Sequence, residues 1–440
     1  MIVGAVAPTA IDAVYAKTKS GAVDPRFGTR GVLEVGPRSK GVRVSTGFLS
    51  AMTRDATGRL IVLGSIETRS RDTTVFLKRF RTDGSSDRRF ANSGSAVVKL
   101  PGWDQAGADS VTVQRDGRIL VAGWAFRDTP SGGKDALTVA RFTSRGRLDR
   151  TFGKQGVRTV TAATEFPYFT NSSITLDDQQ RIVLTANGCR TASAAPSAQV
   201  GLCVVRLGRS GTIDKGFGVS GIASMPVSAG GIDYVGAANS VLVDKAGRIV
   251  VAGYGSQGMS SRLALARFTA AGAADASFGQ GGLVLDATLP TASDNGLVVR
   301  ALSSGQLLVA ATGSNSPLDP SAATLALQRY EQNGSLDKSF GLQGTVIVSS
   351  ATGLLRNSRL GFESDKTGFL LTGVFGNRLK TFRLLASGEV DLSFGASGVT
   401  TFGKKVVGTA GPVLIGRAAY VGGTSDSGKT RRLFVLRLTR

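Results

Sequence analysis

Short runs of apolar residues, each bounded by a glycine-containing turn, recur along the whole chain. Ile119–Gly123 follows the turn Asp116–Arg118, and Ile249–Gly253 follows the pair Gly247-Arg248. Runs of this length between glycine turns are typical of β-strands. The residues from Ile119 to Ala122 are all apolar and do not alternate with polar ones. We therefore expect both faces of this strand to be covered by protein.

A second pattern repeats at a nearly constant period around these runs. The element Asp-x-x-Phe occurs seven times, with successive aspartates 63, 62, 65, 61, 62 and 54 residues apart. In six copies an arginine stands eight residues before the aspartate, with a glycine between them. The aspartates are Asp24, Asp87, Asp149, Asp214, Asp275, Asp337 and Asp391, and the arginines are Arg79, Arg141, Arg206, Arg267, Arg329, Arg383 and Arg437. Self-similarity at a fixed period predicts a repeat architecture, here of seven units.

Each unit has room for four strands. In the second unit they are predicted at 109–114, 118–124, 136–142 and 156–160. These spacings suit an antiparallel meander. Four-stranded sheets packed face to face around an axis cover both faces of their strands and leave only short edges. The sequence therefore predicts an all-β fold, a seven-bladed β-propeller of four-stranded antiparallel blades.

The seventh unit is split between the two ends of the chain. Arg437 takes the place of the repeat arginine, whereas Asp24, Phe27 and a short strand at 32–35 lie near the N-terminus. We expect this N-terminal strand to complete the last blade, which begins with strands at 418–423 and 433–438. Residues 21–440 then form a single propeller, and residues 1–20 are a signal peptide or a disordered N-terminal extension.

These repeats resemble the delta-60 repeat family of bacterial proteins. Its repeat combines an Asp-Gly-Arg-Ile-Leu-Val-Ala-Gly stretch, here Asp116–Gly123, with a Leu-Asp-x-x-Phe-Gly element, here Leu148–Gly153. The resemblance extends over nearly the whole chain from Gly21 onward. It implies a propeller-like fold and no particular activity. Departures are local, such as Ala91 after Phe90 where the repeat has glycine.

The repeated charges have a structural explanation and a functional one. An aspartate that opens a turn accepts hydrogen bonds from backbone N–H groups, and the phenylalanine after it fills the gap between blades. We expect each arginine to pair with an aspartate of its own or a neighbouring blade, because an unpaired buried charge is costly. The alternatives are a ladder of aspartates that binds metal and a ring of arginines that lines an anion site.

The chain is strongly basic, with 53 Lys and Arg residues against 31 Asp and Glu residues, a formal net charge of +22. Such a charge argues for affinity toward polyanions and says nothing about fold. The densest basic group lies in the last unit, at Lys404, Lys405, Lys429, Arg431 and Arg432. Interleaved aromatic residues that stack on bases are missing there, which disfavours nucleic acid. An anionic cell-wall or matrix polymer is the candidate partner, and a solvated surface without a partner is the alternative.

Several kinds of chemistry are excluded by residue type. The chain contains no histidine, which removes Ser-His-Asp and Cys-His catalysis and His-ligated zinc. No phosphate-binding or dinucleotide fingerprint is present, so we expect neither a cofactor nor a metal. No apolar run is long enough to span a membrane.

Two cysteines, Cys189 and Cys203, flank one predicted hairpin connection in the third unit. A disulfide between them would contribute about 3 kcal/mol in the loop-entropy model. Disulfides persist in oxidising compartments, so a bridge would support a secreted or cell-surface location. Two buried free thiols are the alternative.

Ligand binding in repeat proteins is expected at residues that break the repeat. Trp103, Trp124, Tyr168 and Tyr254 lie in or beside irregular connections and suit a sugar or a protein partner, with loop packing as the alternative. We expect a monomeric, non-enzymatic binding scaffold that uses its loops or the mouth of its central channel. The competing hypothesis is a carboxylate- or metal-dependent hydrolase or lyase with its site in that channel.

Overall fold

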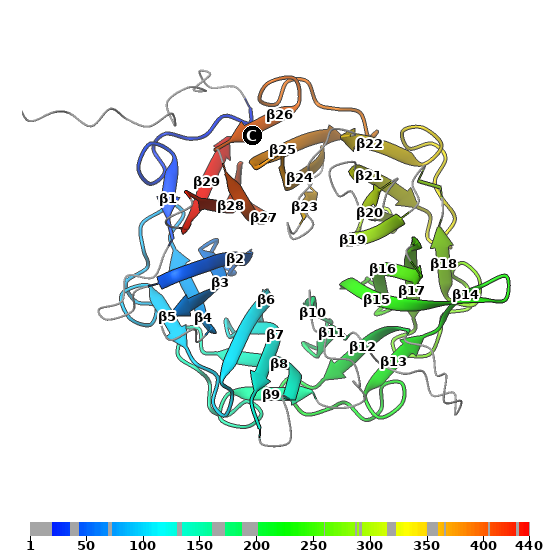
Figure 1. Cartoon of the computed structure of the whole chain (residues 1–440), viewed down its shortest axis with the longest axis horizontal. Helices are drawn as coiled ribbons and strands as arrows, with labels where there is room; N and C mark the ends of the chain where they lie inside the picture. The colour runs from blue at the N-terminus through cyan, green and yellow to red at the C-terminus, as the bar shows by residue number, and fades with distance from the viewer. Residues whose placement is uncertain are drawn as a thin grey trace, which may run out of the picture.

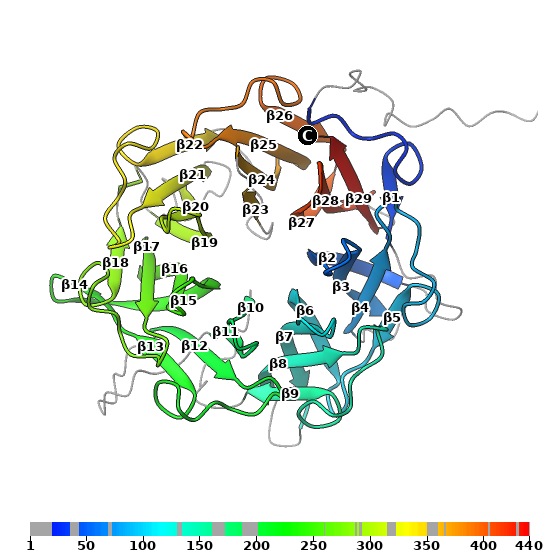
Figure 2. The same cartoon turned by 180° about the vertical axis from the view of Figure 1, so that it is seen from behind.

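The chain forms a ring of seven four-stranded antiparallel sheets around a common axis (Figure 1), and Figure 2 shows the same ring from behind. The sequence prediction of a seven-bladed all-β propeller is confirmed. The computed structural model describes residues 20–35, 44–68, 73–129, 134–160, 172–186, 201–258, 260–286, 288–289, 293–314, 323–349, 360–364, 367–403, 405–427 and 431–439. The segment expected to be a signal peptide or disordered extension lies outside these ranges, apart from Ser20.

Each blade is a meander whose first strand lies nearest the axis and whose last strand lies at the rim (Figure 1). The first three blades are formed by β2 (Val44–Arg54), β3 (Leu60–Thr68), β4 (Thr73–Phe80) and β5 (Ser95–Val98); by β6 (Gln105–Val113), β7 (Ile119–Arg127), β8 (Lys134–Phe142) and β9 (Val157–Val160); and by β10 (Ile174–Leu176), β11 (Ile182–Ala186), β12 (Leu202–Leu207) and β13 (Ile222–Met225).

The next three blades follow the same order. They are formed by β15 (Ile232–Val243), β16 (Ile249–Gln257), β17 (Ser260–Phe268) and β18 (Leu283–Asp286); by β19 (Ser293–Ala301), β20 (Leu307–Ser314), β21 (Ala323–Tyr330) and β22 (Thr345–Ser349); and by β23 (Gly361–Ser364), β24 (Gly368–Phe375), β25 (Arg378–Leu385) and β26 (Val399–Phe402). A further short strand, β14 (Val227–Ala229), forms a hairpin with the start of β15.

The seventh blade joins the two ends of the chain, as the sequence predicts. It consists of β27 (Val406–Ile415), β28 (Ala418–Asp426), β29 (Arg431–Thr439) and, at the rim, β1 (Val32–Glu34). β1 pairs antiparallel with β29, with Leu33 opposite Val435. Beyond this strand, the amide of Gly21 donates to the carbonyl oxygen of Thr439 at 2.6 Å. The ring is therefore closed without a covalent bond.

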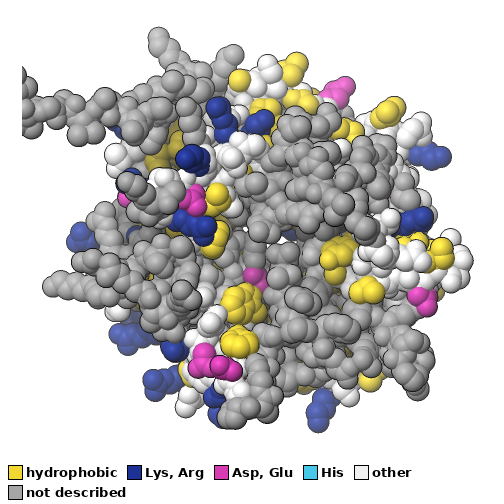
Figure 3. Space-filling model, in the orientation of Figure 1, with side chains coloured by type: hydrophobic (Ala, Val, Ile, Leu, Met, Phe, Trp, Pro, Cys, Tyr) yellow, Lys and Arg dark blue, Asp and Glu magenta, His cyan; other side chains and the backbone are white. Residues whose placement is uncertain are grey.

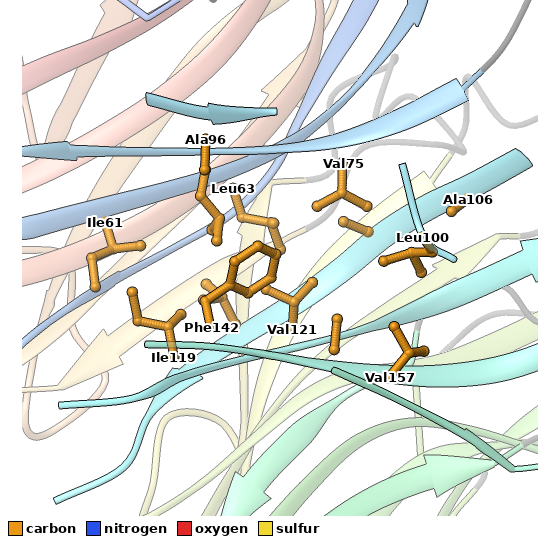
Figure 4. Packing of buried hydrophobic residues seen from close by; sticks show 14 of the residues in the cluster. Ile61, Leu63, Val75, Ala96, Leu100, Ala106, Ile119, Val121, Phe142 and Val157 are labelled. Atoms are coloured by element: carbon orange, nitrogen blue, oxygen red, sulfur yellow. The ribbon is translucent and has the colours of Figure 1, made fainter. Parts of the chain in front are cut away.

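The core lies between the blades. On β7, Ile119 and Val121 pack against the first blade, whereas Leu120 and Ala122 pack against the third. All four side chains are 0–3% exposed, so both faces of this strand are covered, as predicted. Figure 4 shows one such interface, where Phe142 of the second blade lies among residues of the first.

The motif phenylalanines connect each blade to the next one. Phe90 lies against Gly146, in the turn after β8, and a methyl group on Gly146 would sit 2.6 Å from the phenylalanine ring. The amide of Ala91 also donates to the carbonyl oxygen of Arg145 in the same turn, at 2.7 Å. We call this contact the phenylalanine lock. It joins all seven blades through the pairs Phe27–Gly84, Phe90–Gly146, Phe152–Gly211, Phe217–Gly272, Phe278–Gly334, Phe340–Gly388 and Phe394–Gly21.

The strands of the second blade are mostly longer than predicted. β6 begins at Gln105, four residues before the predicted start of this strand at residue 109. The difference has a simple cause, because a β-bulge between Ala108 and Ser110 interrupts the alternation while pairing with β7 continues on both sides of it.

The phenylalanine lock predicts that a side chain added at the turn glycine strongly lowers the free energy of unfolding. Gly146→Ala should lower the free energy of unfolding by about 1–3 kcal/mol more than Gly416→Ala, because its added methyl group overlaps the Phe90 ring. Gly416 is the matched control, since it also has a positive φ but has no atom within 4 Å of an added Cβ. Urea denaturation measures both variants. Equal losses would show that the lock is not tightly packed.

Ring closure predicts a second outcome. Removing residues 20–35 deletes β1 and Gly21, so it leaves the edge of β29 unpaired and Phe394 without its glycine. An unpaired strand edge is a template for association. We expect the shortened protein to aggregate or to melt at a lower temperature, as measured by light scattering and calorimetry. A monomer with unchanged melting behaviour would contradict the split blade.

Candidate functional site

Each repeat arginine is held by several protein groups. In the second blade, Nε of Arg141 donates to Oδ2 of Asp149 at 2.9 Å, and Nη1 donates to the carbonyl oxygen of Arg209 in the next blade at 2.6 Å. The guanidinium carbon lies 4.6 Å from the centre of the Phe152 ring. The arginine thus spans the same junction as the phenylalanine lock.

This arrangement recurs around the ring. The Nε to Oδ2 distance is 2.6–3.1 Å in six blades, for Arg79–Asp87, Arg141–Asp149, Arg206–Asp214, Arg267–Asp275, Arg329–Asp337 and Arg383–Asp391. In the seventh blade, Nη1 of Arg437 lies 3.1 Å from Oδ2 of Asp24. The turn arginine Arg118 adds a second cation to its motif carboxylate, with Nε 3.0 Å from Oδ2 of Asp149. The repeat charges therefore satisfy one another within the protein.

For most of the motif carboxyl groups the pKa lies below its ordinary value. Burial opposes ionisation of Asp149, but the hydrogen bonds from Thr151 and the pairing with Arg141 outweigh it and hold the pKa of Asp149 below its ordinary value. The pKa of Asp87, Asp275 and Asp337 is lowered in the same way, against burial. In Asp391 the hydrogen bond from Ser393 is the main cause of the lower pKa.

A few charged side chains lie on the innermost strands, at a position that is uncharged in the other blades. In each blade the repeat arginine lies on the third strand, opposite a residue of the second strand, and that residue in turn lies opposite one residue of the first, innermost strand. These seven innermost residues are Thr53, Thr112, Thr175, Leu242, Arg300, Glu363 and Val413. Nη2 of Arg300 lies 4.0 Å from Oε1 of Glu363. Together with Arg54 at the end of β2, these two residues are called the axial cluster.

The axial cluster has an unusual electrostatic setting. Burial raises the pKa of Glu363, although Arg300 and Arg54 both act to lower it. More than a third of the side-chain surface of Glu363, 37%, is nevertheless exposed. Water thus reaches a carboxyl group that protein surrounds closely. Such a group can give up or take up a proton, and the two arginines can hold an anion beside it.

The aromatic residues singled out from the sequence do not form one surface. Trp103 is half-buried against the core between the first two blades, and Trp124 is half-buried across Gly107 of β6. Tyr254 is half-buried on β16, and burial raises the pKa of its phenol. Tyr168 lies outside the described residues. Loop and strand packing therefore accounts for much of the surface of the three described residues.

The basic group of the last blade is partly neutralised. Nε of Arg431 lies 3.0 Å from Oδ2 of Asp426, and its guanidinium covers the ring of Phe48 at 4.4 Å. Nη1 of Arg432 lies 3.3 Å from Oε1 of Glu34. Lys405 is exposed, while Lys404 and Lys429 fall outside the described ranges. Phe48 is 43% exposed and is an aromatic residue that the sequence analysis does not single out.

A cleft of about 460 Å³ lies between the first and second blades. Its lining residues are Arg89, Ala91, Arg145 and Arg147. All three arginines are exposed, and none of them forms an ion pair within the described part of the chain. We call this feature the arginine cleft. The sequence analysis misses it, because residues from two repeats meet there.

Of the two cysteines, only Cys203 lies in the described part of the chain. Cys203 is fully buried on β12, and its Sγ lies 3.5 Å from the carbonyl oxygen of Gly201. Cys189 lies outside the described residues, so the disulfide stays a prediction.

The next two observations concern metal binding and membrane-spanning helices. Among the described residues, no group of three or more His, Cys, Asp or Glu side chains is placed to hold a metal ion. No helix in the described part of the chain is long and apolar enough to cross a membrane.

Comparison with known proteins supports the fold. Residues 114–152 and 247–278 match the family described as a domain of unknown function (DUF5122) beta-propeller. The chain is thus similar to β-propeller repeat proteins, while the delta-60 family itself stays an expectation. No curated protein sequence matches the chain.

Three solved structures match the chain at low similarity. The polysaccharide lyase Uly1 is 10% identical, with a TM-score of 0.49, over 99% of this chain and 95% of the lyase. The Trypanosoma rangeli sialidase is 9% identical, with a TM-score of 0.44, over 96% of this chain and 58% of the sialidase. The GH43_1 enzyme from Xanthomonas citri is 13% identical, with a TM-score of 0.34, over 67% of this chain and 91% of that enzyme. Similarity this low transfers no activity to this chain.

The motif aspartates predict how stability depends on pH. Because their pKa in the folded protein lies below the unfolded value, their contribution is complete above that value and is lost as the pH falls through about 4. Glu363 contributes in the opposite direction, since its folded pKa is raised, but it is one group against several. The urea midpoint should therefore decrease steeply from pH 5 to pH 3 (about the range in which carboxyl groups titrate). Asp149→Asn should reduce this decrease, and a midpoint that rises toward low pH would contradict the pairing.

Proposed function

We propose that the protein is a secreted or cell-surface binding module, without enzymatic activity, whose ligand is an anionic polymer. The observation that carries this proposal is the partition of charge between interior and surface. Several carboxylates are buried in the protein interior. Asp55, Asp87 and Asp149 are 8%, 1% and 6% exposed, and each pairs with arginines. Because these interior charges cancel in pairs, the excess of basic over acidic residues lies outside the interior.

The surface therefore carries the net positive charge of the chain. The chain has 53 basic and 31 acidic residues, and exposed bases such as Lys154, Lys215 and Lys338 lie in different blades. Figure 3 shows Lys and Arg side chains spread around the rim of one face. Cations distributed in this way suit a long polyanion, because contact with many charges releases many counterions.

A hydrolase or lyase that acts on such a polymer is the second candidate. The axial cluster favours it, since Glu363 has a raised pKa beside Arg300 and Arg54. A carboxyl group with a raised pKa can serve as a general acid while the arginines hold an anionic substrate. The two functions differ in one outcome, which is whether the polymer is shortened.

Binding to anionic polymers should depend strongly on salt. We expect the protein to bind dextran sulfate or polygalacturonate, and raising the salt from about 0.05 to 0.2 M should weaken binding by about tenfold or more. Neutral dextran of equal length is the control and should not bind. Biolayer interferometry measures the affinities, and size-exclusion chromatography of the polymer tests for cleavage.

Two results would contradict the proposal. Salt-independent binding to neutral dextran would point to an uncharged ligand. Shortening of the polymer that is lost in Glu363→Gln would establish the enzyme instead.

A further inference from the structure

The arginine cleft has walls from two neighbouring blades that are fixed relative to each other. Arg89 and Ala91 follow the aspartate of the first blade, whereas Arg145 and Arg147 belong to the turn after β8 in the second. Between them lies one phenylalanine lock, in which Phe90 packs beneath Gly146. The amide of Ala91 also donates to the carbonyl oxygen of Arg145 at 2.7 Å. The backbone under the three arginines is therefore rigid.

Arg89 departs from the repeat at a position with a structural task. In four other blades this position is a serine or threonine whose hydroxyl donates to the motif aspartate, at Thr151, Ser277, Ser339 and Ser393. The third blade has Gly216 here, and the seventh has Arg26, whose Nε donates to Oδ1 of Asp24 at 3.0 Å. Arg89 keeps only the backbone bond, from its amide to Oδ1 of Asp87 at 3.2 Å. Asp87 already receives the guanidinium groups of Arg79 and Arg59. The side chain of Arg89 is thus exposed and has no carboxylate partner among the described residues.

Arg145 and Arg147 depart from the repeat as well. The two equivalent turn positions elsewhere hold small polar, apolar or acidic residues, namely Asp83 and Ser85, Ser210 and Thr212, Ala271 and Ala273, Asn333 and Ser335, and Ser387 and Glu389. In none of these five turns are both positions basic. Three departures, all to arginine, therefore meet at one of the seven junctions.

The electrostatics of the cleft favour an anionic occupant. Three cations that line one cleft repel one another, and the nearby motif carboxylate Asp149 is engaged by Arg141 and Arg118. The planar guanidinium fork matches the paired oxygens of a carboxylate, sulfate or phosphate group. A cavity of about 460 Å³ is larger than such a group alone and lies in the range of small-ligand pockets. One charged sugar unit has the appropriate size.

We propose that the arginine cleft binds the oxyanion group of one charged sugar unit in an anionic polysaccharide. This inference rests on the proposed function and specifies where the polymer is recognised rather than merely attracted. The cleft supplies a fixed site for one charged unit, and the exposed bases elsewhere supply attraction that does not depend on position.

The test restores the repeat at this junction. The variant Arg89→Thr, Arg145→Ser and Arg147→Thr carries the residues found at the next junction, Thr151, Ser210 and Thr212, and we expect it to fold as the wild type does. The matched control, Lys215→Ser, Lys245→Ser and Lys338→Ser, removes the same charge from exposed positions in three other blades. Melting temperatures and circular dichroism verify that both variants are folded.

Affinities are measured for dextran sulfate and polygalacturonate at about 0.15 M salt. We expect the cleft variant to bind at least one of them about tenfold more weakly or worse, with a shallower salt dependence, while the control changes by about threefold or less. The polymer that loses more affinity distinguishes a sulfate from a carboxylate site. Equal losses in the two variants would overturn the cleft and leave the proposed function intact.

A second arm separates failure of the cleft from failure of the proposed function. Glucuronate and glucose 6-sulfate are titrated into each protein and followed by nuclear magnetic resonance. If wild type binds no polymer but binds a charged monosaccharide that the cleft variant does not bind, the cleft stands and the polymer function fails. If wild type binds neither polymers nor monosaccharides, both proposals are wrong.

Discussion

The packing of a motif phenylalanine beneath the turn glycine of the next blade is the constraint on which the ring depends. A single blade has apolar residues on both faces and cannot cover them alone. The phenylalanine lock sets the distance between neighbouring blades, because the glycine has no side chain that could hold them apart. The repeat arginine spans the same junction from its own aspartate to a carbonyl group of the neighbour. Phenylalanine–glycine packing at all seven junctions, with an arginine-to-carbonyl bond at five of them among the described residues, thus holds neighbouring blades in a similar geometry.

Because only a few residues of each repeat form the junction, the other positions can vary. The junction uses the phenylalanine, the glycine and the arginine–aspartate pair, whereas the residues on either side of the glycine, such as Arg145 and Arg147, are exposed. Substitution there changes the chemistry of the surface without changing the junction. The arginine cleft is such a substitution, since Arg145 and Arg147 flank Gly146 without disturbing its contact with Phe90. A site built on a rigid junction loses little conformational freedom when a ligand binds.

The fold was accessible from sequence because its determinants are periodic. The spacing of Asp-x-x-Phe gave the number of blades, and the split of the last repeat gave the closure by β1. Sites were less accessible, because burial and pairing are properties of contacts between units. Arg431 and Arg432 are prominent in the sequence, yet carboxylates at Asp426 and Glu34 oppose them in space.

The arginine cleft is a site that the sequence alone does not reveal. An alignment of the seven units against one another would mark Arg89, Arg145 and Arg147 as departures. It would not show that residues more than fifty positions apart line one cleft. Glu363 was equally inconspicuous, since its setting arises from Arg54 and Arg300, which belong to other blades. In each case the chemistry depends on contacts between different blades.

Closure by β1 also has a consequence for how the protein is made. β1 leaves the ribosome before the other described strands, but its partner β29 is the last of them, about 400 residues later. At ordinary rates of synthesis, roughly 5–20 residues per second, this segment stays unpaired for about 20–80 s. The first blade has no neighbour on one side during that time. A nascent chain of this kind benefits from a chaperone that shields the waiting edge until the final strand arrives.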